Sequence, residues 1–242
     1  MKCICQKLEV SLIMILVGRS VTSPRCKYSL KKVTDFSERQ LTQMVTLLST
    51  KEKQKFLRQR SLKRRKMLVL ARFLLKKLVA KTFTTKIKLA QLEILNAHGS
   101  TGKPAVYYQG HKLKLELSIS YAYPIVAVAV SNHKLGIDLE TPFADRVQIS
   151  ALLNYCFTKR ELTHLHRQPM TKTYFWEKYW CLKECVGKLL GSGLSYDPKT
   201  IEVFIEGNTF FVVVKQNEAI SRYLKVYVEQ CAMYCFWIVE AC

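Results

Sequence analysis

The chain has 242 residues, 49% of them hydrophobic, with 9 glycines and 6 prolines, a composition that excludes a disordered or fibrous protein. Its formal net charge is +21, and residues 1–100 account for +18 of it with 23 basic and 5 acidic residues. This asymmetry favours a polyanionic partner: nucleic acid, an anionic membrane, a phosphorylated cofactor or an acidic protein.

The first 24 residues are expected to form an N-terminal segment that includes a strand. Glu9 stands directly before the apolar run Val10–Val17, and no small-residue cleavage site follows, so the pattern favours a buried strand over a secretory signal. No apolar run approaches the roughly 20 residues that a transmembrane helix requires. We therefore expect no membrane association.

Residues 25–134 are expected to form an N-terminal half that begins with helices. Cap residues followed by apolar residues at helical spacing predict a first helix within 34–49. Residues 49–66 predict a second, strongly basic helix with a break near Ser61. Residues 67–83 predict a long apolar third helix.

Strand patterns follow a turn-rich segment at 96–104. They predict strands at 112–121, 123–131 and 134–141, the second apolar on both faces, as in the centre of a sheet.

The C-terminal half, 135–242, repeats this order of elements. Helical patterns cover 147–155, 158–166 and 173–191, and strand patterns cover 200–206, 209–216, 223–230 and 232–241. The prediction is an α+β fold of two similar halves related by a pseudo-two-fold axis, each a small, mostly antiparallel sheet packed on helices. No residue-level repeat is visible in the sequence, so the duplication is predicted at the level of architecture alone.

Nine cysteines raise the question of disulfides or a metal site. Their number is odd and no C-x-x-C pair occurs, so the zinc-ribbon pattern is absent. Buried free thiols are the preferred interpretation, which indicates a reducing compartment, the cytoplasm.

Two acidic residues interrupt the apolar strand at 134–141. Because residues two apart on a strand point to the same face, Asp138 and Glu140 project together and repel each other. A hard divalent cation such as Mg²⁺ between them would relieve this repulsion. The alternative is a strand end whose acids meet Lys or Arg.

A second candidate lies on the helix at 173–191, where Glu184 and Lys188 are four residues apart and share a face. The alternative is an ordinary surface pair. The neighbouring Trp180, Leu182 and Val186 indicate a partly buried face, which favours a functional site.

Five elements occur in order along the chain: T-G-K-P at 101–104, L-S-I-S-Y at 117–121, G-I-D-x-E at 136–140, C-F-T-K-R-E-L at 156–162, and W-x-x-K-E-x-x-x-K at 180–188 followed by G-x-G-L. Taken together, these motifs resemble those of the 4'-phosphopantetheinyl transferases, specifically the larger, pseudo-two-fold, surfactin-activating type. The basic helices near residues 49–83 also resemble the N-terminal helices of that type.

The resemblance implies Mg²⁺-dependent transfer of phosphopantetheine from coenzyme A to a serine of a carrier protein, with release of 3',5'-ADP. Asp138, Glu140 and Glu184 would hold Mg²⁺, with Mn²⁺ as an alternative. Glu184 or Glu161 would accept the serine proton, and Lys188 would neutralise charge on the leaving phosphate.

Coenzyme A contacts are implied at Lys103, Pro104, Ser120, Tyr121, Lys55 and Lys183. Lys103 and Pro104 would lie against the adenine nucleotide, Ser120 would donate to a phosphate and Lys55 would meet the 3'-phosphate. Two departures bear on nucleotide affinity: Tyr121 stands where the family has His, and Glu52 stands at a position that is usually basic.

The implied partner is an acidic apo carrier protein, acyl or peptidyl, in fatty-acid or secondary-metabolite biosynthesis, and the implied state is a cytoplasmic monomer. Two alternatives stay open. One is a nucleic-acid-binding module that uses residues 51–66, although this leaves the acids unexplained and nucleic acid is not the expected partner. The other is a relative that binds a carrier without modifying it.

Overall fold

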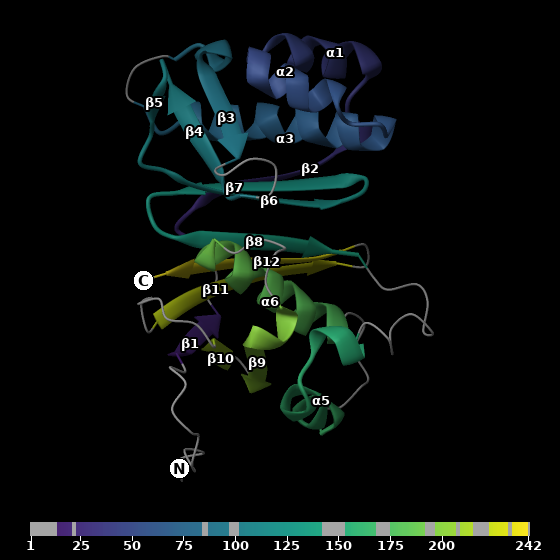
Figure 1. Ribbon diagram of the computed structural model, residues 1–242, viewed down its shortest axis with the longest axis vertical. Helices are drawn as coiled ribbons and strands as arrows, with labels where there is room; N and C mark the ends of the chain where they lie inside the picture. Colours follow the sequence, from purple (N-terminus) through teal and green to yellow (C-terminus); the bar gives the residue numbers. More distant parts are fainter. Residues whose placement is uncertain are drawn as a thin grey trace.

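The computed structural model describes residues 14–20, 23–83, 87–96, 102–141, 153–167, 175–191, 197–206, 209–214, 223–231 and 234–241. The fold is α+β, as predicted, with helices and mostly antiparallel sheets stacked in layers (Figure 1). The predicted helix at 147–155 lies partly outside the described residues. No helix in the described part is long and apolar enough to cross a membrane.

The N-terminal half places three helices over two small sheets. Its elements are β2 (Lys27–Lys32), η1 (Val33–Asp35), α1 (Glu38–Thr46), α2 (Thr50–Leu57), α3 (Leu62–Ala80), η2 (Leu89–Gln91), β3 (Leu92–Asn96), β4 (Pro104–Tyr108), β5 (His111–Lys112), β6 (Glu116–Ala122) and β7 (Ile125–Ser131). One sheet has the order β2-β7-β6 and the other the order β3-β4-β5.

The helix break predicted near Ser61 is confirmed. The boundary predicted after residue 66 is wrong, because α3 continues from Leu62 through the basic residues into the apolar run.

The C-terminal half contains a six-stranded sheet. Its elements are β8 (Leu135–Glu140), α5 (Lys159–His166), α6 (Phe175–Leu190), η4 (Pro198–Thr200), β9 (Ile201–Glu206), β10 (Thr209–Val214), β11 (Tyr223–Cys231) and β12 (Tyr234–Ala241). The strand order is β8-β12-β11-β1-β10-β9, where β1 (Met14–Ser20) runs antiparallel to β10 and parallel to β11. The N-terminal segment therefore completes the sheet of the opposite half.

The two halves meet through an apolar layer between the β2-β7-β6 sheet and the β8 end of the larger sheet. Ile125, Ala127, Ile137 and Ile238 are among its buried members. A fully buried aliphatic side chain contributes about 1.5–3 kcal/mol relative to an exposed one, so this layer can hold the halves together. On the outer sides, α3 covers β7, and α6 covers β8 and β12 (Figure 1).

A buried Glu–Lys pair fastens the helices of the N-terminal half to β3. Glu52 Oε2 accepts from the Ser49 amide at 2.8 Å and from Lys76 Nζ at 2.7 Å, while Oε1 accepts from the Ile94 amide at 3.2 Å. Lys76 Nζ also donates to the Leu47 carbonyl at 2.6 Å. Both charged side chains are fully buried.

The C-terminal half contains the same arrangement. Glu161 Oε2 accepts from the Thr158 amide at 2.9 Å and from Lys183 Nζ at 2.7 Å, while Oε1 accepts from the Val203 amide at 2.8 Å. Lys183 Nζ also donates to the Cys156 carbonyl at 2.7 Å. These contacts relate α2 to α5, α3 to α6 and β3 to β9, so the structure shows a residue-level repeat that sequence inspection did not detect.

Candidate active site

The candidate site forms where β8 lies against β6. On the outer side of β8, the amides of Ile137 and Leu139 donate to the hydroxyl oxygens of Ser118 and Ser120, at 3.1 and 3.2 Å. Two serine side chains thus satisfy backbone groups that an edge strand would otherwise bury unpaired. The pairing fixes Ser120 beside Asp138.

Helix α6 reaches the site because β8 contains a glycine. A Cβ at Gly136 would overlap the backbone carbonyl of Cys185, so only glycine permits this close packing of helix on strand. The glycine of the G-I-D-x-E motif therefore sets the distance across which α6 side chains meet β8.

Asp138 is the centre of the resulting polar cluster and is only 3% exposed. Its Oδ1 accepts from Lys188 Nζ at 2.6 Å and from Ser120 Oγ at 2.7 Å. Burial would lower the pKa of Lys188, but the ion pair with Asp138 outweighs it and raises that pKa. Lys188 Nζ also donates to the Ile137 carbonyl at 3.1 Å.

Glu140 lies two residues along the strand and accepts a hydrogen bond from Trp180 Nε1 at 2.9 Å. Burial, together with the negative charges of Asp138 and Glu184, raises the pKa of Glu140 to about 8 against the opposing effects of Trp180 and Lys188. Glu184 is 5% exposed. Asp138 and Glu184, the other two carboxyl groups predicted from the sequence, are therefore close enough to Glu140 to affect its pKa.

Two features of this cluster fit a divalent cation. The second carboxylate oxygen of Asp138, Oδ2, is buried and has no hydrogen-bond partner among the described residues. Glu140 lies beside the negative charges of Asp138 and Glu184, which add to the effect of burial in raising its pKa. No group of three His, Cys, Asp or Glu side chains in the described part of the chain is arranged to hold a metal as it stands. Lys188 is the cation that contacts Asp138.

A second polar cluster surrounds Asn96 at the end of β3. The side-chain oxygen Oδ1 of Asn96 accepts hydrogen bonds from Lys55 Nζ at 2.8 Å and from Arg72 Nη2 at 3.4 Å. The side-chain nitrogen Nδ2 of Asn96 donates to the Gly102 carbonyl at 2.9 Å. Burial, followed by the Arg72 charge, lowers the pKa of Lys55. The next residue, Lys103, pairs with Glu116, and Pro104 opens β4.

Arg72 is the residue of this cluster that the sequence analysis missed. It is 2% exposed, and its Nε and Nη1 have no hydrogen-bond partner in the described structure, although Nε lies 3.6 Å from Glu52. Unused donors on a buried guanidinium favour an anionic ligand. The available signal was an arginine within the otherwise apolar run at 67–75.

Tyr121 lies between the two clusters. It follows Ser120 on β6, is 46% exposed, and both Arg72 and Lys188 act on it electrostatically. The predicted residues Lys55, Lys103, Ser120, Tyr121 and Asp138 thus follow one path from Asn96 to β8.

Two predicted site residues lie elsewhere. Glu161 and Lys183 are both 0% exposed, and their contacts with each other and with the backbone use both carboxylate oxygens. Burial raises the pKa of Glu161 and lowers that of Lys183, while their mutual contact opposes both shifts. The structure therefore pairs Glu161 with Lys183 inside the C-terminal half, and their roles as proton acceptor and coenzyme contact stay predictions.

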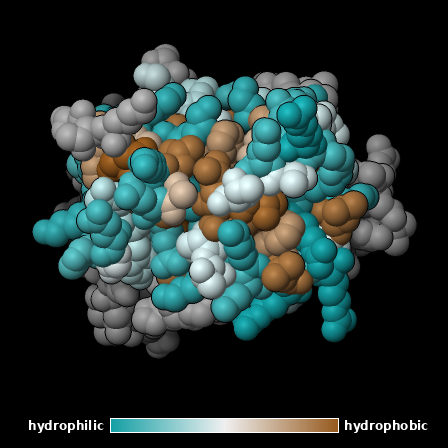
Figure 2. All heavy atoms as spheres, turned by 90° about the horizontal axis from the view of Figure 1, so that it is seen from above, coloured by the Kyte–Doolittle hydropathy of each residue, from teal (hydrophilic) through white to brown (hydrophobic). Residues whose placement is uncertain are grey.

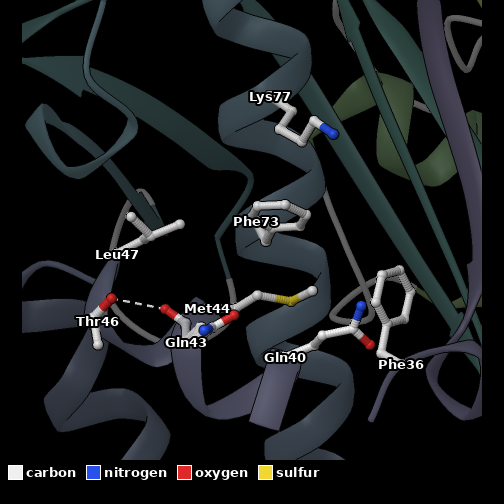
Figure 3. A pocket seen from close by; sticks show the side chains of 8 residues that line it. All are labelled: Phe36, Gln40, Gln43, Met44, Thr46, Leu47, Phe73 and Lys77. Carbon is white, nitrogen blue, oxygen red and sulfur yellow. Dashed lines mark hydrogen bonds between the residues drawn. The ribbon is translucent and has the colours of Figure 1, made fainter.

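A groove of about 550 Å³ opens between α1 and α3 (Figure 3). Its lining consists of Phe36, Gln40, Gln43, Met44, Thr46, Leu47, Phe73 and Lys77. None of these is a predicted site residue, and we do not assign the groove to the reaction.

Comparison with known families bears on the C-terminal half. Residues 134–235 match the model of the 4'-phosphopantetheinyl transferase superfamily. The resemblance inferred from the motifs is confirmed at that level. The matched superfamily domain begins just before β8, extends into β12 and includes Asp138, Glu140, Glu184 and Lys188. A search of curated proteins finds no match to the chain.

Proposed function

We propose that the protein transfers the 4'-phosphopantetheine arm of coenzyme A to a serine of an apo carrier protein and releases 3',5'-ADP. The observation that carries the proposal is the β8–α6 cluster within the superfamily match: three interacting carboxyl groups, a buried oxygen of Asp138 without a partner, and Lys188 beside it.

In the proposed reaction the serine oxygen forms a bond to the β-phosphorus of coenzyme A, and the bond from that phosphorus to the bridging oxygen breaks. The serine proton leaves to Glu184, directly or through water, and 3',5'-ADP departs with the bridging oxygen. Glu184 is favoured over Glu161 because Glu184 belongs to the β8–α6 cluster, whereas both oxygens of Glu161 are already occupied.

Asp138, Glu140 and Glu184 would hold Mg²⁺, or Mn²⁺ in its place, which when bound supplies positive charge to the diphosphate. Lys188 would add a second positive charge on the same side. Phosphoryl transfer depends mostly on positioning and charge neutralisation, so these four side chains are sufficient.

The nucleotide of coenzyme A is assigned to the Asn96 cluster. Lys55 and Arg72 would bind the 3'-phosphate through unused donors and positive charge, and Lys103 and Pro104 would border the adenine. Tyr121 and Ser120 lie between this cluster and β8, where the pantetheine diphosphate would lie. The positive charge from Lys55 and Arg72 replaces the charge that the family's histidine would supply at position 121.

We also propose that the protein is a cytoplasmic monomer of the larger, surfactin-activating type. The support is that both proposed subsites lie within one chain, and that Cys26, Cys156, Cys181, Cys185 and Cys235 are buried free thiols.

The test is mass spectrometry of an apo acyl carrier protein incubated with the protein, coenzyme A and Mg²⁺. The carrier should gain the mass of one phosphopantetheine arm, and the gain should disappear when its acceptor serine is replaced by alanine. A carrier that stays unmodified across acyl and peptidyl types would contradict the proposal.

A further inference from the structure

The turn between α2 and α3 presents exposed leucines among unpaired basic residues. Leu57, which ends α2, is 65% exposed, and Leu62, which begins α3, is 64% exposed, so two large apolar side chains reach solvent on either side of one turn. Arg58, Arg60 and Lys63 are exposed around them. We call these five residues the leucine–arginine patch. In Figure 2, which looks onto this half of the molecule, hydrophobic residues reach the surface among hydrophilic ones.

The patch has the charge of a docking surface for an acidic partner. No ion pair among the described residues involves Arg58, Arg60 or Lys63, so their charges are not neutralised within this part of the chain. Apolar anchors surrounded by unpaired arginines favour a protein that brings carboxylates around an apolar centre. Phosphate backbones of nucleic acid would leave the leucines without a role.

The turn is held in place before any partner arrives. Arg65 Nε donates to the Gln59 carbonyl at 2.7 Å and Arg65 Nη2 donates to the Leu57 carbonyl at 3.3 Å. The Arg65 guanidinium also lies over the Phe56 ring, 5.6 Å from its centroid. A fixed turn reduces the entropy lost on binding, which suits a recognition surface.

The patch also adjoins the candidate active site. Lys63 Nζ lies 4.9 Å from the centroid of the Tyr123 ring, and Tyr123 is 47% exposed. Tyr123 follows Ser120 by three residues, a path of about 10 Å at strand spacing. Ser120 contacts Asp138 directly. In Figure 1 the β6–β7 turn, the end of β8 and the start of α3 lie on the same side of the molecule.

We infer that the acidic carrier protein binds to the leucine–arginine patch and Tyr123, while its serine is modified beside the Asp138 cluster. This inference rests on the proposed function and names the surface that its protein substrate uses. A typical interface covers roughly 800 Å² of each partner, which corresponds to a disc of about 16 Å radius. A carrier whose interface includes the patch and Tyr123 therefore ends within about 10 Å of Ser120, measured along the strand.

The test compares two double variants with equal change in charge, using an apo acyl carrier protein as the probe. Arg58→Glu/Arg60→Glu alters the patch. Lys112→Glu/Lys114→Glu alters exposed lysines near β5, which lies at the opposite end of the N-terminal half in Figure 1. The patch variant should raise KM for the carrier at least ten-fold, with kcat and KM for coenzyme A unchanged, and the control should change none of them. Leu57→Ser/Leu62→Ser should raise the same KM at 0.5 M salt, where charge is screened.

The outcomes separate this inference from the proposed function. If the wild-type protein modifies the carrier and the patch variant behaves like the control, the docking surface is wrong and the transferase proposal stands. If no carrier is modified by the wild type, the proposed function fails first. Loss of binding to phosphatidylserine vesicles or to tRNA in the patch variant, with KM for the carrier unchanged, would assign the patch to a membrane or to nucleic acid and overturn the inference.

Discussion

The Glu161–Lys183 pair allows a quantitative test of the site assignment. Replacing Lys183 by Met leaves a carboxylate that is 0% exposed without its counter-ion. Removing one partner of a buried pair typically costs about 3–5 kcal/mol, a large part of the 5–15 kcal/mol that stabilises most domains. With a urea m-value of about 2 kcal/mol per molar, the unfolding midpoint should fall by roughly 1.5–2.5 M.

The loss should also depend on pH. Without Lys183, burial raises the pKa of Glu161, so the carboxyl group can become protonated and the penalty should be smaller at pH 5 than at pH 8. Lys76→Met is the matched comparison, because Lys76 makes the same contacts with Glu52 in the N-terminal half; it should cost less, since Arg72 stays 3.6 Å from Glu52. Urea unfolding followed by circular dichroism measures both. Wild-type stability in Lys183→Met, together with lost transfer, would show instead that Lys183 contacts a substrate.

Three further predictions concern the site itself. Glu184→Gln should abolish phosphopantetheine transfer with the melting temperature within a few degrees of wild type, whereas Glu161→Gln should lower the melting temperature; the reverse pattern would exchange their roles. Lys55→Gln should raise the Kd for coenzyme A about ten-fold or more in calorimetry and leave the Kd for dephospho-coenzyme A nearly unchanged, because a charge-assisted hydrogen bond to the 3'-phosphate is lost. In metal-free protein the folded-state pKa of Glu140, about 8, exceeds its unfolded value, so the stability that Glu140 contributes is complete below about pH 4.5 and decreases by up to about 1.4 kcal/mol per pH unit up to pH 8. Glu140→Gln should remove this decrease in urea titrations with EDTA, and an unchanged pH profile would show that the pKa of Glu140 is not raised in the folded protein.

The features that sequence predicted well are those encoded by neighbouring residues. The two-residue spacing of Asp138 and Glu140 on a strand, and the four-residue spacing of Glu184 and Lys188 on a helix, are local patterns. The structure has β8 and α6 where these patterns place them. Gly191 ends α6 with a φ of +86°, as a terminal glycine suggests.

The features that sequence missed depend on contacts between distant residues. Lys183 meets Glu161 across 22 residues, and nothing local distinguishes this buried lysine from one that faces a substrate. The strand β1 pairs with β10 and β11 near the far end of the chain. From the sequence, Arg72 looks like an ordinary basic residue on the polar face of a helix. The structure shows instead that it is buried and contacts Asn96.

The internal repeat had a detectable sequence signal. Ser49-x-x-Glu52 and Thr158-x-x-Glu161 are both capping boxes that begin short helices. Each is followed by a lysine that pairs with its glutamate, at Lys76 and Lys183. The lysine follows its glutamate by 24 residues in one half and by 22 in the other, so the capping boxes are the local signal and the contacts establish the full equivalence.

The central claim is that Asp138, Glu140 and Glu184 together bind one divalent cation. Titration of the protein with Mn²⁺ in the presence of coenzyme A, followed by electron paramagnetic resonance, measures this directly. We predict one bound Mn²⁺ per chain in the wild type, displaced by excess Mg²⁺ and lost in Asp138→Asn, with circular dichroism showing that this variant is folded at the assay temperature. Equal Mn²⁺ binding in the wild type and in Asp138→Asn would contradict the claim.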